Sequence, residues 1–315
     1  MLVKNRPAGY CKRFCISGAK ARFMKISPRR QIRFFWQRHA MALCFLLPLF
    51  LAAYWALAVE PALLRECDRT VALPNLAPSL EGFTIAVVSD LHLNWRRKEK
   101  LADYAACINR RRPDLIILLG DMVNSPRRPT DPAPAELSQW LRTLRARHGI
   151  CGVLGNHDVG FGTAWITEVL KAGGCRVLSN ETLRIGPERG GLNLIGIDYR
   201  NSSLDDSLGF CRRLLRKDCV NLLLFHTPDL FPEQPREIAL TLAGHTHGGQ
   251  LALPFCGALL GYSRYGRRYV YGHIREADGR QMIVTSGLGG TRDIRFCVPP
   301  EIVFVKLTNS RKSAK

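Results

Sequence analysis

Short apolar runs recur along the chain, and each is followed by polar residues. Residues 84–88 form a run rich in Val and Ile, which predicts a buried strand. Comparable runs predict strands at 114–121 and 151–155, and helical patterns occupy the intervals at 97–111 and 135–147. Strand, helix and strand within about 40 residues is typical of a βαβ unit with parallel strands.

The pattern changes after a predicted helix at 163–172. Gly, Pro and Asn separate short runs that predict strands, and one further helical stretch lies among them. The expected strands are 175–179, 182–186, 192–197, 220–225, 238–243, 268–274, 281–286 and 301–307, with the helix at 207–217. Mixed strands with flanking helices predict an α/β fold in which two β-sheets are packed between helices.

An uncharged run of 20 residues, 40–59, precedes these elements. It is long enough to cross a bilayer as a helix. The basic residues 1–39 before it predict an anchor in the inner (cytoplasmic) membrane, with a cytoplasmic amino terminus and an extracytoplasmic domain. The proline-rich residues 60–82 predict a linker, 83–307 the folded domain and 308–315 a basic tail.

Two alternatives compete with a transmembrane anchor. Residues 27–33 partly resemble a twin-arginine export signal, and cleavage within 56–58 would release the domain. Pro28, directly before the arginine pair, departs from the usual signal. A helix buried in a globular core is the other alternative, and the length and flanking charge asymmetry of the run argue against it.

The net charge of +20 is unevenly distributed. Residues 1–59 contain 11 Lys or Arg and no acidic residue, while the remainder contains 35 basic and 26 acidic residues. For the folded domain this excess predicts either solubility alone or attraction to phosphate, on a lipid or on a substrate. No basic helix or aromatic-interleaved patch indicates nucleic acid, so none is expected as a partner. The 11 cysteines include no Cys-x-x-Cys, which excludes the zinc-ribbon and thioredoxin patterns.

Residues with metal-binding side chains follow five of the predicted strands. They are Asp90 and His92, Asp121, Asn156 and His157, His226, and His245 and His247. A single histidine after a strand is usually an ordinary loop residue. Five such strand ends, which hold five of the chain's eight histidines, predict one shared site. Open α/β sheets bind ligands at the carboxyl ends of their strands.

The donor types indicate the chemistry. Carboxylate, imidazole and amide groups without thiolate favour Mn²⁺, Fe or Zn²⁺. The donors are too many for one tetrahedral ion, so two ions that share a carboxylate fit better. Two such ions lower the pKa of a bridging water, and the resulting hydroxide can attack phosphorus in line. Phosphate ester hydrolysis uses that arrangement.

In sequence order, these five motifs resemble those of the calcineurin-like metallophosphoesterases over residues 83–250. The resemblance implies a four-layer αββα sandwich and two divalent ions, with Mn²⁺ as the expected metal. The implied ligands are Asp90, His92 and His247 for the first ion, Asn156, His226 and His245 for the second, and Asp121 as the bridge. His157 would stabilise or protonate the leaving oxygen, and Asp158 would orient His157.

The carboxyl-terminal third is similar to the bacterial membrane-associated branch of this family, of the YaeI and YkuE type. The similar segments are 263–269, 287–289 and 298–301. Some members of the wider group hydrolyse UDP-2,3-diacylglucosamine in lipid A synthesis. The cluster Arg264, Arg267 and Arg268 predicts either a phosphate-binding site or a solvated basic face.

We therefore expect a membrane-anchored, dimetal phosphodiesterase that acts on a phosphoester substrate. Lipid-linked phosphoesters are among the substrates considered. One alternative is a pyrophosphatase for UDP-2,3-diacylglucosamine, which an extracytoplasmic site would disfavour, because UDP-sugar lipids are made inside the cell. The other alternative is a catalytically inactive membrane scaffold. A scaffold has no use for His157, so the intact set of motifs argues against it.

Overall fold

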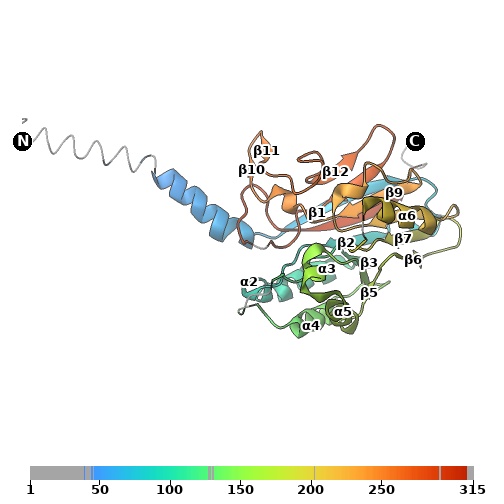
Figure 1. Ribbon diagram of the computed structural model, residues 1–315, viewed down its shortest axis with the longest axis horizontal. Helices are drawn as coiled ribbons and strands as arrows, with labels where there is room; N and C mark the ends of the chain where they lie inside the picture. Colours follow the sequence, from blue (N-terminus) through green and yellow to red (C-terminus); the bar gives the residue numbers. More distant parts are fainter. Residues whose placement is uncertain are drawn as a thin grey trace, which may run out of the picture. The chain divides into compact units, whose positions relative to one another are not determined.

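The computed structural model describes residues 39, 44, 46–126, 129, 131–201, 203–290 and 292–310. The chain divides into two compact units, Met1–Leu51 and Ala52–Lys315. In the first unit residues 46–51 are helical, and the predicted basic segment lies outside the described residues up to position 38. The second unit contains both sheets and the candidate site (Figure 1).

Two mixed β-sheets form the centre of the second unit. The first runs β1 (Arg65–Leu73), β14 (Glu301–Asn309), β2 (Thr84–Val88), β3 (Leu115–Leu118), β4 (Ile150–Gly152) and β5 (Cys175–Val177). The second runs β12 (Gly272–Arg275), β13 (Gln281–Val284), β9 (Ile238–Ala243), β8 (Val220–Leu224), β7 (Leu192–Gly196) and β6 (Glu181–Ile185). Strands β2 to β5 and β7 to β9 are parallel, whereas β14 pairs antiparallel with β2 and β6 pairs antiparallel with β7. The prediction of two mixed sheets is confirmed.

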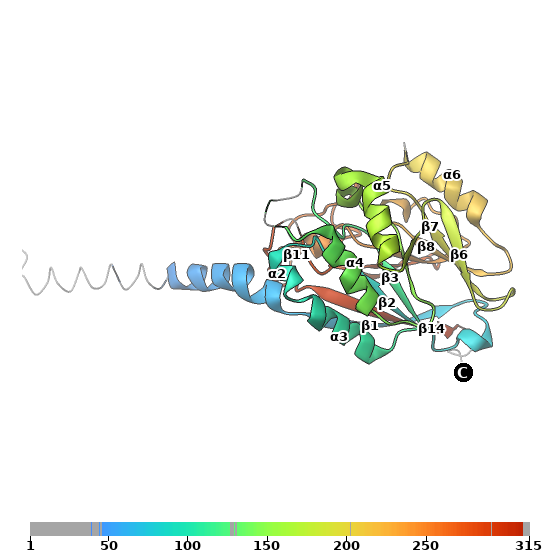
Figure 2. The same cartoon turned by 90° about the horizontal axis from the view of Figure 1, so that it is seen from below.

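Helices cover the outer face of each sheet (Figure 2). They are α2 (Trp95–Lys98), α3 (Leu101–Arg111), α4 (Pro134–Thr143) and α5 (Asn156–Ala172) on the first sheet and α6 (Leu204–Leu214) on the second. Residues 85–88 of β2 are all buried, because both faces of this strand are covered. Ile85 and Val87 face the second sheet, while Ala86 and Val88 face the helices. Alternate strand residues point to opposite faces, so a strand between two layers is apolar throughout. The result is the predicted four-layer sandwich.

Short elements complete the described part of the fold. They are the π-helical turn η1 (Trp55–Val59), the 3₁₀ turns η2 (Glu60–Ala62), η3 (Pro78–Leu80), η4 (Pro228–Leu230) and η5 (His247–Gly249), and the two-stranded pair β10 (Ala252–Leu253) and β11 (Gly257–Ala258). Turn η5 and the β10–β11 pair follow directly after β9, so they lie close to the carboxyl ends of the strands.

The predicted linker 60–82 is wrong for most of its length. It contains β1, whose nine residues pair in parallel with β14 from Arg65 and Glu301 to Leu73 and Asn309. This edge strand carries four charged residues among its first five, which gives it the composition of a linker, although Leu73 is fully buried. Strand β14 also extends into the predicted basic tail, as far as Asn309.

The predicted anchor falls partly outside the described residues, because 40–43 and 45 are not among them. Residues 46–54 of the run are helical. Within the described ranges, no helix combines the length and the hydropathy that a bilayer crossing needs. The anchor therefore stays a prediction.

Candidate metal centre

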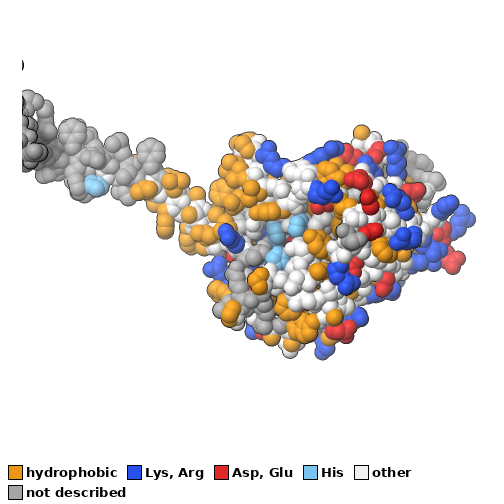
Figure 3. Space-filling model, viewed as in Figure 1, with side chains coloured by type: hydrophobic (Ala, Val, Ile, Leu, Met, Phe, Trp, Pro, Cys, Tyr) orange, Lys and Arg blue, Asp and Glu red, His pale blue; other side chains and the backbone are white. Residues whose placement is uncertain are grey.

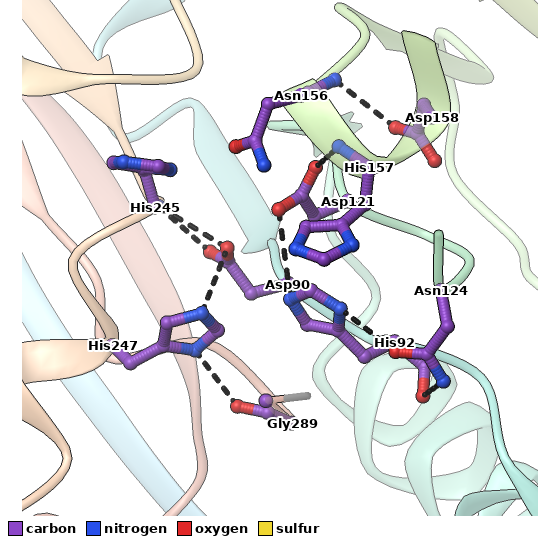
Figure 4. Close-up of polar contacts among 12 residues, drawn as sticks. Asp90, His92, Asp121, Asn124, Asn156, His157, Asp158, His245, His247 and Gly289 are labelled. Carbon is purple, nitrogen blue, oxygen red and sulfur yellow. Dashed lines mark hydrogen bonds and ion pairs between the residues drawn. The ribbon is translucent and has the colours of Figure 1, made fainter. Parts of the chain in front are cut away.

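Strand ends from both sheets meet at one edge of the sandwich, and the predicted ligands lie there. Asp90 and Asp121 follow β2 and β3 of the first sheet, while His226 and His245 follow β8 and β9 of the second. Figure 4 shows the labelled side chains directed toward one another from different elements. Asp90 and His245 are 155 positions apart in the sequence. The backbone N–H of His245 donates a hydrogen bond to the Asp90 carboxylate at 3.0 Å.

Among the residues that the structure describes, three groups of side chains each have donor atoms within 4.8 Å of one another. The groups are Asp90, His92 and His247; His92, Asp121 and His157; and Asp121, His226 and His245. Asn156 adjoins the last group, because its Oδ1 lies 3.1 Å from Nε2 of His226. The structure therefore brings together all seven ligands expected from the sequence, in the two sets that the family resemblance implies.

The Asp121 carboxylate lies between the two sets. Its Oδ2 is 3.5 Å from Nε2 of His92 and 3.4 Å from Nε2 of His226. Its Oδ1 accepts the backbone N–H of His157 at 2.8 Å. Although burial raises the pKa of Asp121, His226 and the other histidines hold it well below its usual range, so the group is ionised. A charged oxygen equidistant from one histidine of each set occupies the position of a bridging ligand.

Carbonyl oxygens behind the rings select the nitrogen that faces the site. Nδ1 of His226 donates to the carbonyl of Leu119 at 2.6 Å, and Nδ1 of His247 donates to the carbonyl of Gly289 at 2.9 Å. In both rings Nε2 is therefore the atom presented to the centre, as is usual for metal-binding histidines. Burial lowers the pKa of His247 to about 4, whereas Asp121 outweighs burial at His226 and raises the pKa to about 9.

His92 tests most directly whether these residues fit metal ions. Its ring is fully buried, and Nδ1 donates to Oδ1 of Asn124 at 3.2 Å. Burial and the neighbouring His247 hold the pKa of His92 well below its usual value, so the ring is neutral. Among the described residues, Nε2 has no hydrogen-bond partner, and it faces the ionised Asp121 oxygen. Two buried acceptors that face each other need a cation between them, so the residues fit a metal ion.

The backbone at five of the ligands adopts a left-handed conformation. The φ angles are +52° at Asp90, +43° at His92, +53° at Asp121, +69° at His245 and +50° at His247. Such angles cost a non-glycine residue about 1–3 kcal/mol each, and they persist only where the surrounding structure enforces them. The strained turns redirect the chain at the strand ends and gather the ligand side chains at one point.

Two motif glycines are required because the ligands pass close to their Cα atoms. A Cβ atom at Gly155 would lie 2.6 Å from the backbone nitrogen of Asp121 and 2.7 Å from the ring of His226. A Cβ atom at Gly244 would lie 2.5 Å from Oδ2 of Asp90. Real Cβ atoms do not approach other atoms so closely, so any side chain at either position would displace a ligand.

His157 stands at the start of α5, which begins at Asn156 rather than at the predicted residue 163. The backbone N–H of Ser125 donates to Nδ1 of His157 at 3.1 Å. Since Nδ1 accepts a hydrogen bond, the proton of the neutral ring is on Nε2. One ring nitrogen of His157 also belongs to the donor group that contains His92 and Asp121. His157 is therefore beside the centre with a proton available on its outer nitrogen.

The hydrogen bonds of Asp158 run to backbone amides, and its expected role in orienting His157 stays a prediction. The Asp158 side chain is completely buried and binds backbone amides instead. Oδ1 accepts from Met122 N–H at 2.9 Å and from Val123 N–H at 3.3 Å, and Oδ2 accepts from Gly155 N–H at 3.1 Å. Burial and the nearby Asp121 raise its pKa to about 7. Asp158 thus holds the loop after β3 against the start of α5.

The three arginines singled out in the sequence lie on the surface. Nη1 of Arg267 donates to the carbonyl of Ala258 at 3.2 Å, and Arg268 forms an ion pair with Glu276 at 2.9 Å. The backbone N–H of Arg264 donates to the Asp229 carboxylate at 3.1 Å. Arg267 and Arg268 are therefore held by neighbours on the surface, and their binding of phosphate stays a prediction.

Sequence reasoning missed several residues that support the centre. Asn124 fixes the tautomer of His92, and its position three residues after Asp121 was the available signal. Arg295, only 2% exposed, donates to the carbonyl of Gly289, the same oxygen that accepts from His247. Nothing in the sequence marks Arg295, because its contacts are to backbone carbonyls.

Comparison with known proteins agrees with this geometry. The signature of the family described as "Calcineurin-like phosphoesterase" matches residues 83–258. The metallophosphoesterase YkuE of Bacillus subtilis is 31% identical over 262 residues, which cover 81% of this chain and 90% of the relative. The phosphodiesterase YaeI of Escherichia coli is 30% identical over 242 residues (74% and 83%). The UDP-2,3-diacylglucosamine pyrophosphatase LpxG of Chlamydia trachomatis is 24% identical over 313 residues (80% and 92%).

These relatives include the branch expected from the carboxyl-terminal segments. Calcineurin-like phosphoesterases use two divalent metal ions, which agrees with the two sets of ligands that Asp121 joins. Fold, ligand geometry and sequence similarity therefore lead to the same conclusion. The chain belongs to the calcineurin-like phosphoesterases and is a metal-dependent phosphoester hydrolase.

Proposed function

We propose that this protein is a phosphodiesterase that works with two divalent ions, natively Mn²⁺, at the inner membrane. The position of Asp121 is the observation that carries the proposal, because one carboxylate oxygen lies 3.4 and 3.5 Å from histidines of the two sets. When bound, two such ions supply the Lewis acidity that activates water and neutralises phosphate charge. The carboxylate, imidazole and amide donors, without thiolate, suit Mn²⁺, Fe or Zn²⁺, and Mn²⁺ is the one we propose.

The residues around the centre have separate roles in the proposed reaction. His157 holds a proton on Nε2 and donates it to the leaving oxygen of the ester. The left-handed turns and the carbonyls behind the rings hold the ligand atoms in place before substrate arrives, which reduces the reorganisation needed during the reaction. Phosphate oxygens of the substrate are drawn to the basic surface that includes Arg264.

The test is hydrolysis of bis-p-nitrophenyl phosphate by the full-length protein. We expect activity that exhaustive chelation abolishes and that Mn²⁺ restores. Asp121→Asn should reduce the number of ions bound as well as the rate, because it removes the charge shared by both sets. Asp103→Asn on the exposed face of α3 is the matched control and should leave both unchanged. Activity that survives complete chelation would disprove the two-metal reading.

A second candidate is hydrolysis of the pyrophosphate bond of UDP-2,3-diacylglucosamine. The similarity to LpxG, over 80% of this chain, supports it. Release of UMP from this lipid, at a rate above that for bis-p-nitrophenyl phosphate, would favour the second candidate over a general phosphodiesterase. A protein that cleaves only the diester would exclude it.

The membrane location is proposed from the uncharged run 40–59 and the basic residues before it. The protein should sediment with membranes and resist carbonate extraction. A reporter fused to the carboxyl terminus should be active outside the cytoplasm. A soluble product that begins near Val59 would show instead that the run is a cleaved export signal.

A further inference from the structure

An apolar hairpin projects from the domain directly after the ligand turn of His247. It comprises residues 251–262, in which β10 and β11 pair antiparallel and Leu259 N–H donates to the carbonyl of Leu251 at 2.8 Å. Its exposed large side chains are Leu253, Phe255, Leu259, Leu260 and Tyr262, and Phe255 at the turn is completely exposed. Figure 3 shows hydrophobic side chains gathered at this edge, next to a hollow in which histidine side chains are visible.

This collection of side chains is unusual for a surface in contact with water alone. Scattered exposed apolar residues are normal, but a contiguous group marks a site of interaction. Backbone hydrogen bonds attach the hairpin to the domain, and its large side chains remain 41–50% exposed, with Phe255 completely exposed. The exposed part of these side chains, and above all Phe255, does not stabilise the fold, and its placement at the protruding end needs another explanation.

The hairpin is attached to the part of the domain where the chain enters from the uncharged run. Ala252 N–H donates to the carbonyl of Phe296 at 2.8 Å, and Phe296 N–H donates to the carbonyl of Gln250 at 3.0 Å. The residues on either side of Phe296 bind the entering chain. Arg295 N–H donates to the carbonyl of Ala56 at 2.9 Å, and Cys297 N–H donates to the Glu60 carboxylate at 2.8 Å. One short segment thus fastens both the hairpin and the end of the apolar run.

The segment that contains the hairpin is basic, although Arg268 pairs with Glu276 and the Asp229 carboxylate accepts the backbone N–H of Arg264. Residues 251–275 contain no Asp or Glu, and Arg264, Arg267 and Arg268 are exposed within this stretch. Arg267 donates to the carbonyl of Ala258 within the hairpin itself, at 3.2 Å. Apolar side chains at a protruding turn, with basic side chains behind them, match the interface of a bilayer that contains anionic lipids. An anionic bilayer presents an apolar interior below a layer of negative charge, in the same order as the side chains of this face.

We propose that the apolar hairpin inserts into the surface of an anionic bilayer and holds the metal centre toward the lipid headgroups. The hairpin begins four residues after His247, so insertion brings the centre to the headgroup layer. The substrate that this arrangement suits is a phosphoester carried by a lipid. This substrate class rests on the proposed phosphodiesterase function, whereas insertion of the hairpin does not.

Insertion is tested with the full-length protein in phosphatidylcholine vesicles with and without phosphatidylglycerol. A nitroxide is attached to the exposed Cys256, after Cys44, Cys219, Cys297 and the two cysteines before residue 39 are replaced by serine. With anionic vesicles we expect the label to be relaxed by oxygen and protected from a water-soluble nickel complex. A label on Asp278→Cys, in the turn between β12 and β13, is the control and should stay accessible to nickel.

A label on Cys256 that stays accessible to nickel would overturn the proposal. A label shielded from both reagents would overturn it too, since contact with a protein, including a second copy of this chain, excludes oxygen and nickel alike. If protection of the label requires phosphatidylglycerol, the hairpin inserts through this basic face. Attachment through the amino-terminal run alone would not depend on that lipid.

The consequence for catalysis is measured with two substrates that share a leaving group. Phe255→Asp should lower the rate on a dialkylglycerol p-nitrophenyl phosphate in vesicles about tenfold or more, the loss expected when one aromatic side chain no longer partitions into lipid. The same variant should hydrolyse soluble bis-p-nitrophenyl phosphate at the unaltered rate. Equal rates of variant and wild type on the lipid substrate would contradict the role of the hairpin. Failure of the wild type on both substrates would refute the proposed function, and the label on Cys256 would then decide insertion by itself.

Discussion

Replacing Asp158 with Asn removes one hydrogen-bond acceptor from a buried junction. The two carboxylate oxygens accept three backbone N–H groups, from Met122, Val123 and Gly155. An Asn side chain has only one oxygen, so its NH₂ group must face at least one of these N–H groups. The least costly orientation keeps the bonds to Met122 and Val123 and sets NH₂ against Gly155.

The magnitude follows from that mismatch. Above about pH 7, where Asp158 is ionised, losing a hydrogen bond to this charged group costs about 1.5–3 kcal/mol, and a buried donor left unpaired adds a similar penalty. The variant also removes the repulsion between Asp158 and Asp121, which offsets part of the loss. We therefore expect Asp158→Asn to lower the free energy of unfolding of the metal-depleted protein by about 1–3 kcal/mol. The loops that carry Asp121 and Asn156 would loosen, and affinity for Mn²⁺ should fall about 10–100-fold.

Urea unfolding in chelator and titration calorimetry with Mn²⁺ measure the two effects. Glu168→Gln is the matched control, because Glu168 is an exposed carboxylate of the same helix, paired with Lys171 at 3.1 Å. It should change stability by less than about 0.5 kcal/mol. The reasoning is refuted if Asp158→Asn keeps the stability and metal affinity of the wild type but loses rate only on esters with poor leaving groups. That outcome would mean that Asp158 acts through His157 after all.

Three further outcomes are expected. His157→Ala should lose about 10²–10⁴-fold in kcat, less for good leaving groups, while metal analysis still finds two ions, because a proton donor and not a ligand is removed. Gly244→Ala should weaken Mn²⁺ binding in calorimetry, because its Cβ atom would lie 2.5 Å from Oδ2 of Asp90. Burial raises the pKa of Glu301, but hydrogen bonds led by that from Cys67 leave it lowered. Its ionised form therefore stabilises the fold above about pH 4.3, and Glu301→Gln should flatten the loss of stability in urea unfolding as the pH falls below that value.

The ligands of the site could be predicted from the sequence, whereas most of the residues that hold these ligands in place could not. Asp90, Asp121 and His226 were found because each follows a strongly apolar strand, and parallel strands end at a common edge. The backbone partners of Asp158 were not predicted, since they are amides 35 and 36 residues away and one amide at the start of its own helix. Backbone N–H and carbonyl groups are present in every residue type, so bonds to them cannot be read from the sequence, and Arg295, which donates to backbone carbonyls, was missed for the same reason.

The errors in the fold have a similar origin. Strand β1 was interpreted as a linker because its charged residues face solvent at a sheet edge, and only its pairing with β14 makes it a strand. The β10–β11 pair was not predicted at all, since Pro254, Cys256 and Gly257 interrupt any alternation of apolar and polar residues. Local pattern suffices where both faces of a strand are buried, and it fails where distant pairing decides.

The position of β14 has a consequence for how the chain is made. The first sheet is ordered β1, β14, β2, so the last strand to be synthesised separates two of the first. Strand β2 can pair with β3 early, but its other edge and the whole of β1 stay without a partner until Glu301–Asn309 has left the ribosome. Contacts between residues so distant in sequence form slowly. We expect the sandwich to close only after synthesis ends, so a chain that stops before residue 301 would expose two unpaired strand edges and become a target for chaperones and proteases.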